Sequence, residues 1–244
     1  MSALAPVPIY EPGSRPELFQ FPALFLSASV PYKRKGLTAP ADIARNDGYV
    51  QTAKPDLIRE AVAHLCRFTF QRDLNLIFGA HPSIAPMVLE AARRFGVANG
   101  RKQVLVFQSA YFESDIIPRE TLELANWASG ELLWTEQRPQ RGQPDRTQSL
   151  THMRQVMAQS PHLIGAIFIG GMEGVEEESS LFQQHQPGKP CYALGSTGSA
   201  AKDLLSRSPD AFSGNNRAIH ASDLLRLESY PLVMKRLFAD LGVP

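Results

Sequence analysis

The residues best suited to chemistry lie in one stretch, Leu163 to Glu178, which reads LIGAIFIGGMEGVEEE. An almost continuous apolar run ends at Gly170 and Gly171, and the chain enters an acidic segment after Gly174. Such a run is typical of a strand buried on both faces. A buried strand, a glycine turn and a new helix together place backbone N–H groups where they can bind an anion.

The acidic residues around Gly174 indicate which kind of anion fits. Glu173, Glu176, Glu177 and Glu178 suit the positive end of a helix dipole. They would repel a bare phosphate, whereas a carboxylate readily accepts hydrogen bonds from ribose hydroxyls. The stretch therefore favours a nucleotide over an isolated phosphate.

Three other turns of small and polar residues follow predicted strands. They lie at Ser27 to Pro31, Gly79 to Ser83 and Gly195 to Ser199. Because the carboxyl ends of parallel strands meet at one edge of a sheet, we expect all four turns to line one crevice. His81, in the second of these turns, has two interpretations, a capping residue or a ligand contact, and the sequence leaves both open.

The elements that must position these turns alternate between apolar runs and helical patterns. Strands are predicted at Phe21 to Val30, Leu74 to Phe78, Val104 to Phe107, Glu131 to Thr135, Leu163 to Ile169 and Cys191 to Leu194. Helical patterns separate most of them, and one begins near Pro55, a residue type suited to the first turn of a helix. This alternation predicts an α/β fold with a doubly wound, mostly parallel, Rossmann-like sheet in three layers.

The domain organisation follows from where the regular patterns begin. Four prolines among the first sixteen residues oppose regular structure and predict an extended N-terminal arm at residues 1–20. Residues 21–244 are then a single Rossmann-like domain. Within it, the polar residues 32–53 predict a long loop that could cover the crevice.

Composition excludes several classes of protein. Of 244 residues, 43% are hydrophobic and 20% charged, which is typical of a soluble globular protein. A net charge of +1 gives no support to nucleic-acid binding, and the basic cluster Lys33-Arg34-Lys35 is interpreted as a solvated loop, with a phosphate-facing role second. Cys66 and Cys191 fit neither a metal site nor a disulfide framework, so we expect a cytoplasmic protein. The sequence predicts no signal peptide and no membrane-spanning segment.

Three enzyme classes find no support in the sequence. A dinucleotide-dependent dehydrogenase would show GxGxxG after its first strand, and a P-loop enzyme would show GxxxxGK[ST]. Neither motif occurs. No histidine or carboxylate pair has the spacing of metal ligands, so we predict no metal site.

The four turns together resemble the SLOG superfamily, a Rossmann-like group that includes the LOG ("Lonely Guy") proteins and the DNA-processing protein DprA. LOG enzymes carry PGGxGTxxE after a buried strand, and the matching text here is IGGMEGVEEE. FLSASVP, FGAHPSI and LGSTGSAA resemble further loops of a prokaryotic branch that is predicted to sense nucleotide-derived ligands in antiviral defence and conflict systems. The resemblance covers about Phe21 to Leu205, and it implies that the protein forms homo-oligomers and acts with an effector protein.

The chain differs from LOG enzymes at the residues that catalyse their reaction. Those enzymes hydrolyse the N-glycosidic bond of a nucleoside monophosphate with an arginine–lysine pair and the glutamate of the motif. The aligned pair here is Met153-Arg154, and one extra residue precedes Gly174. Met153 cannot stabilise charge at a leaving group, and the extra residue shifts Glu177 and Glu178 relative to the glycines.

Two hypotheses remain. The first is a sensor that binds an ADP-ribose-like or NAD-like ligand and requires no cofactor. Its predicted ligand-binding residues are Ser27, Ser29, Gly79, His81, Arg154, Gly170, Gly171, Met172, Glu173, Gly174, Glu177, Thr197, Gly198 and Ser199. The second is a LOG-type phosphoribohydrolase, with Glu177, Glu178 and Arg154 as the candidate catalytic residues.

Overall fold

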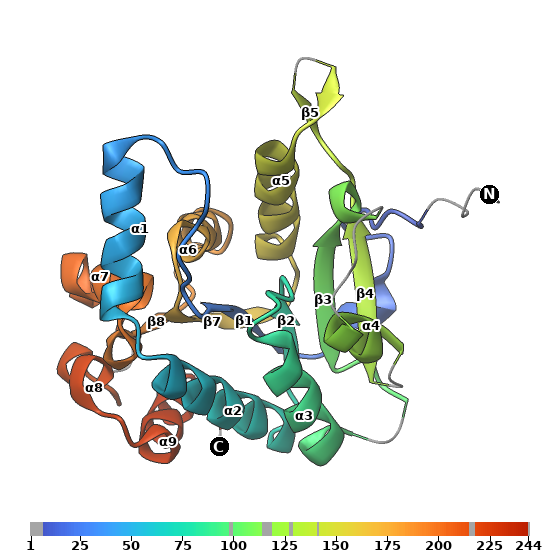
Figure 1. The fold of residues 1–244 in the computed structure, drawn as a ribbon. Helices are drawn as coiled ribbons and strands as arrows, with labels where there is room; N and C mark the ends of the chain where they lie inside the picture. The colour runs from blue at the N-terminus through green and yellow to red at the C-terminus, as the bar shows by residue number, and fades with distance from the viewer. Residues whose placement is uncertain are drawn as a thin grey trace.

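The computed structural model describes residues 7–97, 100–113, 119–126, 129–140, 142–214 and 218–243. Among them a six-stranded sheet has the order β4-β3-β2-β1-β7-β8, and every neighbouring pair is parallel (Figure 1). Its strands are β1 (Ala23–Ser29), β2 (Asn75–Phe78), β3 (Val104–Ser109), β4 (Gly130–Thr135), β7 (Leu163–Gly170) and β8 (Cys191–Leu194). The predicted doubly wound α/β fold is confirmed.

The helices cover both faces of this sheet, which gives three layers (Figure 1). One face carries α2 (Pro55–Gln71), α3 (Ala85–Phe95) and α4 (Arg119–Asn126), with α9 (Tyr230–Asp240) packed on α2. The other face carries α5 (Arg146–Ala158), α6 (Glu173–His185) and α7 (Ser199–Arg207). The chain changes faces when it returns from the edge strand β4 to β7, because crossovers between parallel strands are right-handed.

A ring contact of β1 shows which of its side chains face α6. Phe25 packs against Phe182 of α6, with ring centroids 5.2 Å apart. Because successive side chains of a strand alternate between faces, Ser27 and Ser29 point to the same side as Phe25, toward α6. The apolar part of β1 therefore anchors the sheet, and its polar end faces the start of α6.

Smaller elements connect this framework. They are the 3-10 helices η1 (Pro16–Phe19), η2 (Ala110–Phe112), η3 (Gly195–Thr197) and η4 (Pro209–Ala211), the hairpin β5 (Pro139–Gln140) and β6 (Gln143–Pro144), and helix α8 (Ala221–Arg226). None of the helices in the described ranges is long and apolar enough to span a membrane.

Residues 32–53 do not form the predicted long loop, because most of them belong to helix α1 (Pro40–Thr52). Its buried residues are Asn46 and Tyr49. With so little apolar surface to bury, α1 lacks the periodic pattern by which an amphipathic helix is recognised. Only the stretch before Pro40 remains a connecting loop.

The N-terminal segment is joined to the domain more closely than an extended arm would be. Ile9 forms a parallel bridge with Trp134 beside the edge strand β4, and the Tyr10 N–H donates to the Trp134 carbonyl at 2.7 Å. Leu18 and Phe19 of η1 are buried in the core. The described part of the segment is thus held by the sheet edge, while residues 1–6 lie outside the described ranges.

Candidate functional site

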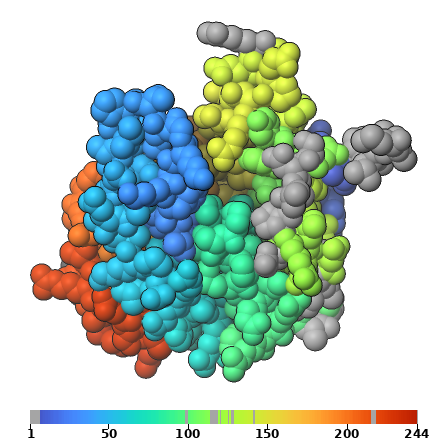
Figure 2. Space-filling model, viewed as in Figure 1, coloured from blue at the N-terminus to red at the C-terminus, as the bar shows by residue number. Residues whose placement is uncertain are grey.

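The candidate site lies at the carboxyl ends of β1 and β7. β1 continues to β2 on one side, whereas β7 continues to β8 on the other, so the strand order reverses between them. Their last paired residues are Ser29 and Gly170. In the view of Figure 2, the surface is hollowed between the blue segment around α1 and the yellow segment of the β5–β6 hairpin, with α5 recessed between them. Ligands of open α/β sheets bind at such a switch point.

Ser27 and Ser29 lie at the carboxyl end of β1, on the side of the sheet that faces α6. Ser27 is only 1% exposed, and its Oγ makes no hydrogen bond of full geometry with another described residue. It does approach the Glu178 carboxylate closely enough to lower the pKa of that group. The carbonyl of Ser29 accepts the Gly171 N–H at 2.8 Å, which fixes the turn after β7.

The turn after β2 brings His81 to the same edge. The Ser83 Oγ accepts the Val30 N–H at 3.0 Å and lies 2.8 Å from His81 Nδ1, which in turn accepts the Ser83 N–H at 3.2 Å. His81 Nδ1 is therefore an acceptor, so the proton of the neutral ring resides on Nε2. Burial, together with the positive charge of Arg154, lowers the pKa of His81 to about 4.

The turn between β7 and α6 requires its glycines. Gly170 and Gly171 have φ of +57° and +85°, and a Cβ on Gly170 would lie 2.4 Å from the Ile58 side chain. Met172 is the N-cap of α6 and provides no side-chain capping bond. The first amides of a helix point outward along its axis, so the start of α6 offers donors to an anion.

Arg154 of α5 is the centre of the site. Its Nη1 donates to Glu177 at 2.5 Å and its Nε donates to Glu178 at 3.3 Å. Its Nη2 lies against the first turn of α6, where a Cβ on Gly174 would be only 2.8 Å away. The structure thus brings Arg154 together with the two glutamates that the resemblance to LOG enzymes groups with it.

The two glutamates differ in their surroundings. Glu178 is largely buried, and burial raises its pKa, although Arg154 and Ser27 oppose that shift. Glu177 is more exposed, and the Thr151 hydroxyl donates to its Oε1 at 2.5 Å while Arg154 occupies its Oε2. Both carboxylates therefore already have donors within the chain.

Arg34, in the loop between β1 and α1, approaches the start of α6. Its Nη2 forms an ion pair with Glu173 Oε2 at 2.9 Å, although the angles fall short of a hydrogen bond. The loop is held in place by Asn46, which accepts the Arg34 N–H at 3.1 Å and donates to the Tyr32 carbonyl. The predicted site residues did not include Arg34; the basic run at residues 33–35 was the available signal.

The chain matches the model of a known protein family. The model of the SLOG cluster3 family matches residues 48–226, well over half of the chain. The chain belongs to the SLOG cluster3 family. The resemblance to the SLOG superfamily is thereby confirmed. Arg154 and the whole turn from β7 into α6 lie within the match, whereas Ser27, Ser29 and Arg34 precede it. No curated protein matches this chain in sequence.

The fourth predicted turn of this SLOG cluster3 protein is engaged in bonds within the chain. Thr197 Oγ1 accepts the Gly170 N–H at 2.9 Å and donates to the Leu194 carbonyl. The Ser199 hydroxyl donates to the Tyr49 carbonyl at 2.8 Å. Gly198 has φ +80°, and a Cβ there would lie 1.9 Å from the Thr52 carbonyl oxygen. These residues hold α1 and the β7 turn together, and their role as ligand contacts stays a prediction.

The remaining predicted residues line the same turn region. Gly79 follows β2, and a Cβ on it would lie 3.3 Å from the Met153 Cε, so the turn packs directly on α5. The Met172 sulfur accepts a weak hydrogen bond from Asn46 Nδ2 at 3.5 Å. Among the described residues of this SLOG cluster3 protein, no group of His, Cys, Asp and Glu is arranged to hold a metal ion.

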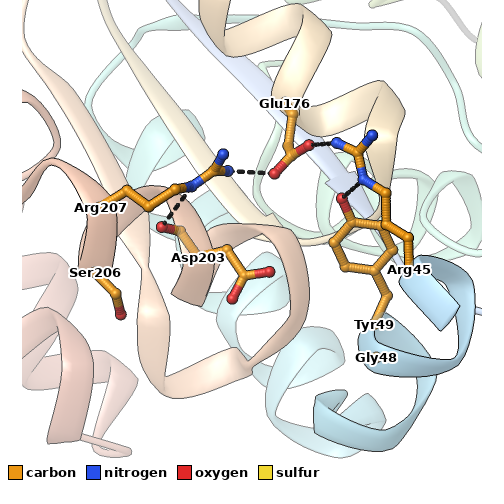
Figure 3. Close-up of a pocket in the computed structure, with 7 residues that line it drawn as sticks. All are labelled: Arg45, Gly48, Tyr49, Glu176, Asp203, Ser206 and Arg207. Atoms are coloured by element: carbon orange, nitrogen blue, oxygen red, sulfur yellow. Dashed lines mark hydrogen bonds and ion pairs between the residues drawn. The ribbon is translucent and has the colours of Figure 1, made fainter. Parts of the chain in front are cut away.

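A shallow hollow of about 480 Å³ lies on the outer side of α6, away from the crevice (Figure 3). Glu176 lies between Arg45 of α1 and Arg207 of α7 and pairs with both. The Tyr49 hydroxyl accepts from Arg45 Nε at 2.9 Å. Glu176 and Glu178 are two residues apart and face different sides of α6. The hollow is thus a polar junction that fastens α1 to the domain, separate from the site around Arg154.

Proposed function

We propose that this SLOG cluster3 protein is a sensor domain that binds a nucleotide-derived ligand, ADP-ribose-like or NAD-like, in a prokaryotic defence or conflict system. One observation carries the proposal. The guanidinium of Arg154 is held against the uncapped start of α6, at the point where the strand order of a parallel sheet reverses. Open amides and a fixed guanidinium are complementary to a phosphate group.

The phosphate would bind at the first turn of α6. The Nη2 of Arg154 faces Gly174 and is not one of the nitrogens that pair with Glu177 and Glu178. The Ser29 hydroxyl lies at the end of the adjacent strand, on the α6 side of the sheet. A phosphate there would receive donors from a helix terminus, a side chain and a strand end, which together fix its position.

The ribose would bind beside Glu177. A ribose hydroxyl can replace the Thr151 hydroxyl as the donor to Glu177 Oε1, and one hydrogen bond is then exchanged for another. His81 contributes a donor, because its pKa of about 4 keeps the ring neutral at pH 7 with the proton on Nε2. A neutral donor can bind an oxygen of the base or the ribose, and it adds no positive charge to the site.

The test measures binding and base release in parallel. The protein is incubated with nucleoside monophosphates, NAD and ADP-ribose, while thermal stability and free base are followed. The sensor proposal expects stabilisation by at least one compound without base release. Arg154→Gln should abolish the stabilisation, whereas Arg59→Gln should not, because Arg59 lies on the opposite face and pairs with Asp56. If no compound stabilises the protein, the proposal fails.

One observation favours the hydrolase as a second candidate. Glu177 and Glu178 flank one arginine, and burial raises the pKa of Glu178, as is found for carboxyl groups that act as general acids. Base release from a nucleoside monophosphate that is lost in both Glu177→Gln and Glu178→Gln would establish this activity and contradict the sensor. If base release persists in both variants, Glu177 and Glu178 are not the catalytic residues.

A further inference from the structure

We propose that Arg34 is the second arginine of the site and that, together with Arg154, it binds the diphosphate of the ADP-ribose-like or NAD-like ligand. This inference rests on the proposed function, since it assigns a further binding residue to the same site. Its starting point is the first turn of α6, where two arginines from different parts of the chain meet neighbouring residues. Arg34 pairs with Glu173, and Arg154 lies against Gly174, the next residue along the helix.

The position of Arg34 is built into the fold. Its backbone N–H donates to Asn46 Oδ1, and the Asn46 amide nitrogen donates to the Tyr32 carbonyl two residues earlier. Asn46 is buried, although its helix α1 buries little else. A buried asparagine that bonds the backbone on both sides of Lys33 fixes the loop, so that Arg34 projects toward α6.

The pairing of Arg34 with Glu173 is suited to exchange. The two atoms are 2.9 Å apart, yet Glu173 Oε2 lacks a hydrogen bond of good geometry with any described residue. The Arg34 side chain is 37% exposed. A partly exposed ion pair contributes little to stability, whereas a guanidinium–phosphate contact can be bidentate. A phosphate can therefore replace the carboxylate at small cost.

Arg154 also has a nitrogen, Nη2, that could bind a phosphate. Its Nη1 and Nε bind Glu177 and Glu178, so Nη2 is the group that faces the start of α6. Arg34 and Arg154 thus approach one helix terminus at residues whose Cα atoms are about 3.8 Å apart. Two arginines at neighbouring positions match two linked phosphates better than one.

A buried hydroxyl indicates that the crevice is built for a polar ligand. Ser27 is almost fully buried below this turn, and its Oγ has no hydrogen bond of full geometry with a described residue. Its contact with Glu178 leaves an acceptor position of the hydroxyl free among the described residues, and a donor on a ligand could fill it. Ser27 points to the α6 side of the sheet, beside Glu178, and so lies on the ligand side of the site.

The experiment compares AMP, ADP and ADP-ribose by isothermal titration calorimetry with the intact chain. AMP and ADP-ribose carry nearly the same charge at pH 7, so their comparison separates a diphosphate from charge alone. We expect the two diphosphates to bind about tenfold or more tightly than AMP, as one additional charge-assisted contact provides. Arg34→Gln should remove that preference, so that AMP, ADP and ADP-ribose bind with similar affinity.

Lys33→Gln is the matched control, since it removes the same charge from the same loop. The Lys33 side chain is 78% exposed, and its Nζ lies 3.9 Å from Asp47 Oδ1. The control should keep the preference for diphosphates. Equal binding of AMP and ADP-ribose by the unaltered protein would overturn the inference while leaving the proposed function standing. A preference that survives Arg34→Gln would overturn the role of Arg34, and failure of all three nucleotides to bind would overturn both proposals.

Discussion

Replacing Gly174 with alanine separates ligand binding from folding in one step. The residue is the second of α6 and has no unusual backbone angle, so alanine fits the helix. Glycine in a helix is less stable than alanine by about 0.5–1 kcal/mol, and less than that near the helix end. The melting temperature of Gly174→Ala should stay within about 3 °C of that of the unaltered protein, because the gain in helix propensity and the displacement of Arg154 act in opposite directions.

The same methyl group would disturb Arg154. It would lie 2.8 Å from Nη2, and an ordinary contact begins at 3.4 Å, so the guanidinium must move by the difference, about 0.6 Å. A hydrogen bond from Nη2 to a phosphate would lengthen beyond about 3.2 Å, the upper end of the usual range. Loss of one charge-assisted hydrogen bond corresponds to a reduction in affinity of about 10- to 100-fold.

Calorimetric titration with the tightest nucleotide, together with thermal unfolding of the free protein, tests both halves of this expectation. Gly48→Ala is the control, because Gly48 lies within α1 and nothing is within 4 Å of its Cβ position. That variant should match or exceed the stability of the unaltered protein and bind normally. Unchanged affinity in Gly174→Ala would refute the placement of the phosphate beside Arg154.

Other predictions concern the residues that shape the crevice. His81 has a pKa near 4 in the folded protein and near 6.5 when unfolded, so the unfolded chain binds more protons between these values. Stability should therefore fall by up to about 3 kcal/mol as the pH drops from 6.5 to 4, and urea titrations of His81→Asn, which keeps an acceptor near Nδ1, should show a smaller loss. Thr197→Val removes the acceptor of the buried Gly170 N–H and should lower the free energy of unfolding by about 1–3 kcal/mol, whereas Thr197→Ser should be nearly neutral. Gly198→Ala should prevent accumulation of soluble protein, because its Cβ would lie 1.9 Å from the Thr52 oxygen at a φ of +80°; normal expression and melting would contradict this.

The sequence predicted those elements that a short run of neighbouring residues identifies by itself. β7 and β8 are fully or almost fully buried, and an uninterrupted apolar run identifies such strands directly. The turn at Gly170 and Gly171 was equally visible, because the positive φ that it requires favours glycine. Arg154 could be placed beside the glutamates only through the resemblance to LOG proteins, since α5 and α6 belong to different units of the chain.

Features held by polar contacts between distant segments could not be predicted in this way. Helix α1 is fastened by Asn46, by Arg45 with Glu176, and by the turn at Ser199, and none of these contacts leaves a periodic pattern. The position of Arg34 depends on that helix, so the ligand role of the basic run could not be decided from sequence. Ser199 seemed free to bind a ligand because its acceptor, the Tyr49 carbonyl, is remote in the chain.

The donors around Glu177 favour binding over bond cleavage. Thr151 donates to one oxygen of Glu177 and Arg154 to the other, and these donors reduce the negative charge that could stabilise a sugar cation. A ribose hydroxyl, by contrast, replaces the Thr151 donor one for one. Glu178 is held by Arg154 in a buried position beside Ser27, where it balances the charge of the guanidinium. Removing one partner of a largely buried ion pair is strongly destabilising, so we propose that the primary role of Glu178 is to hold Arg154 in place.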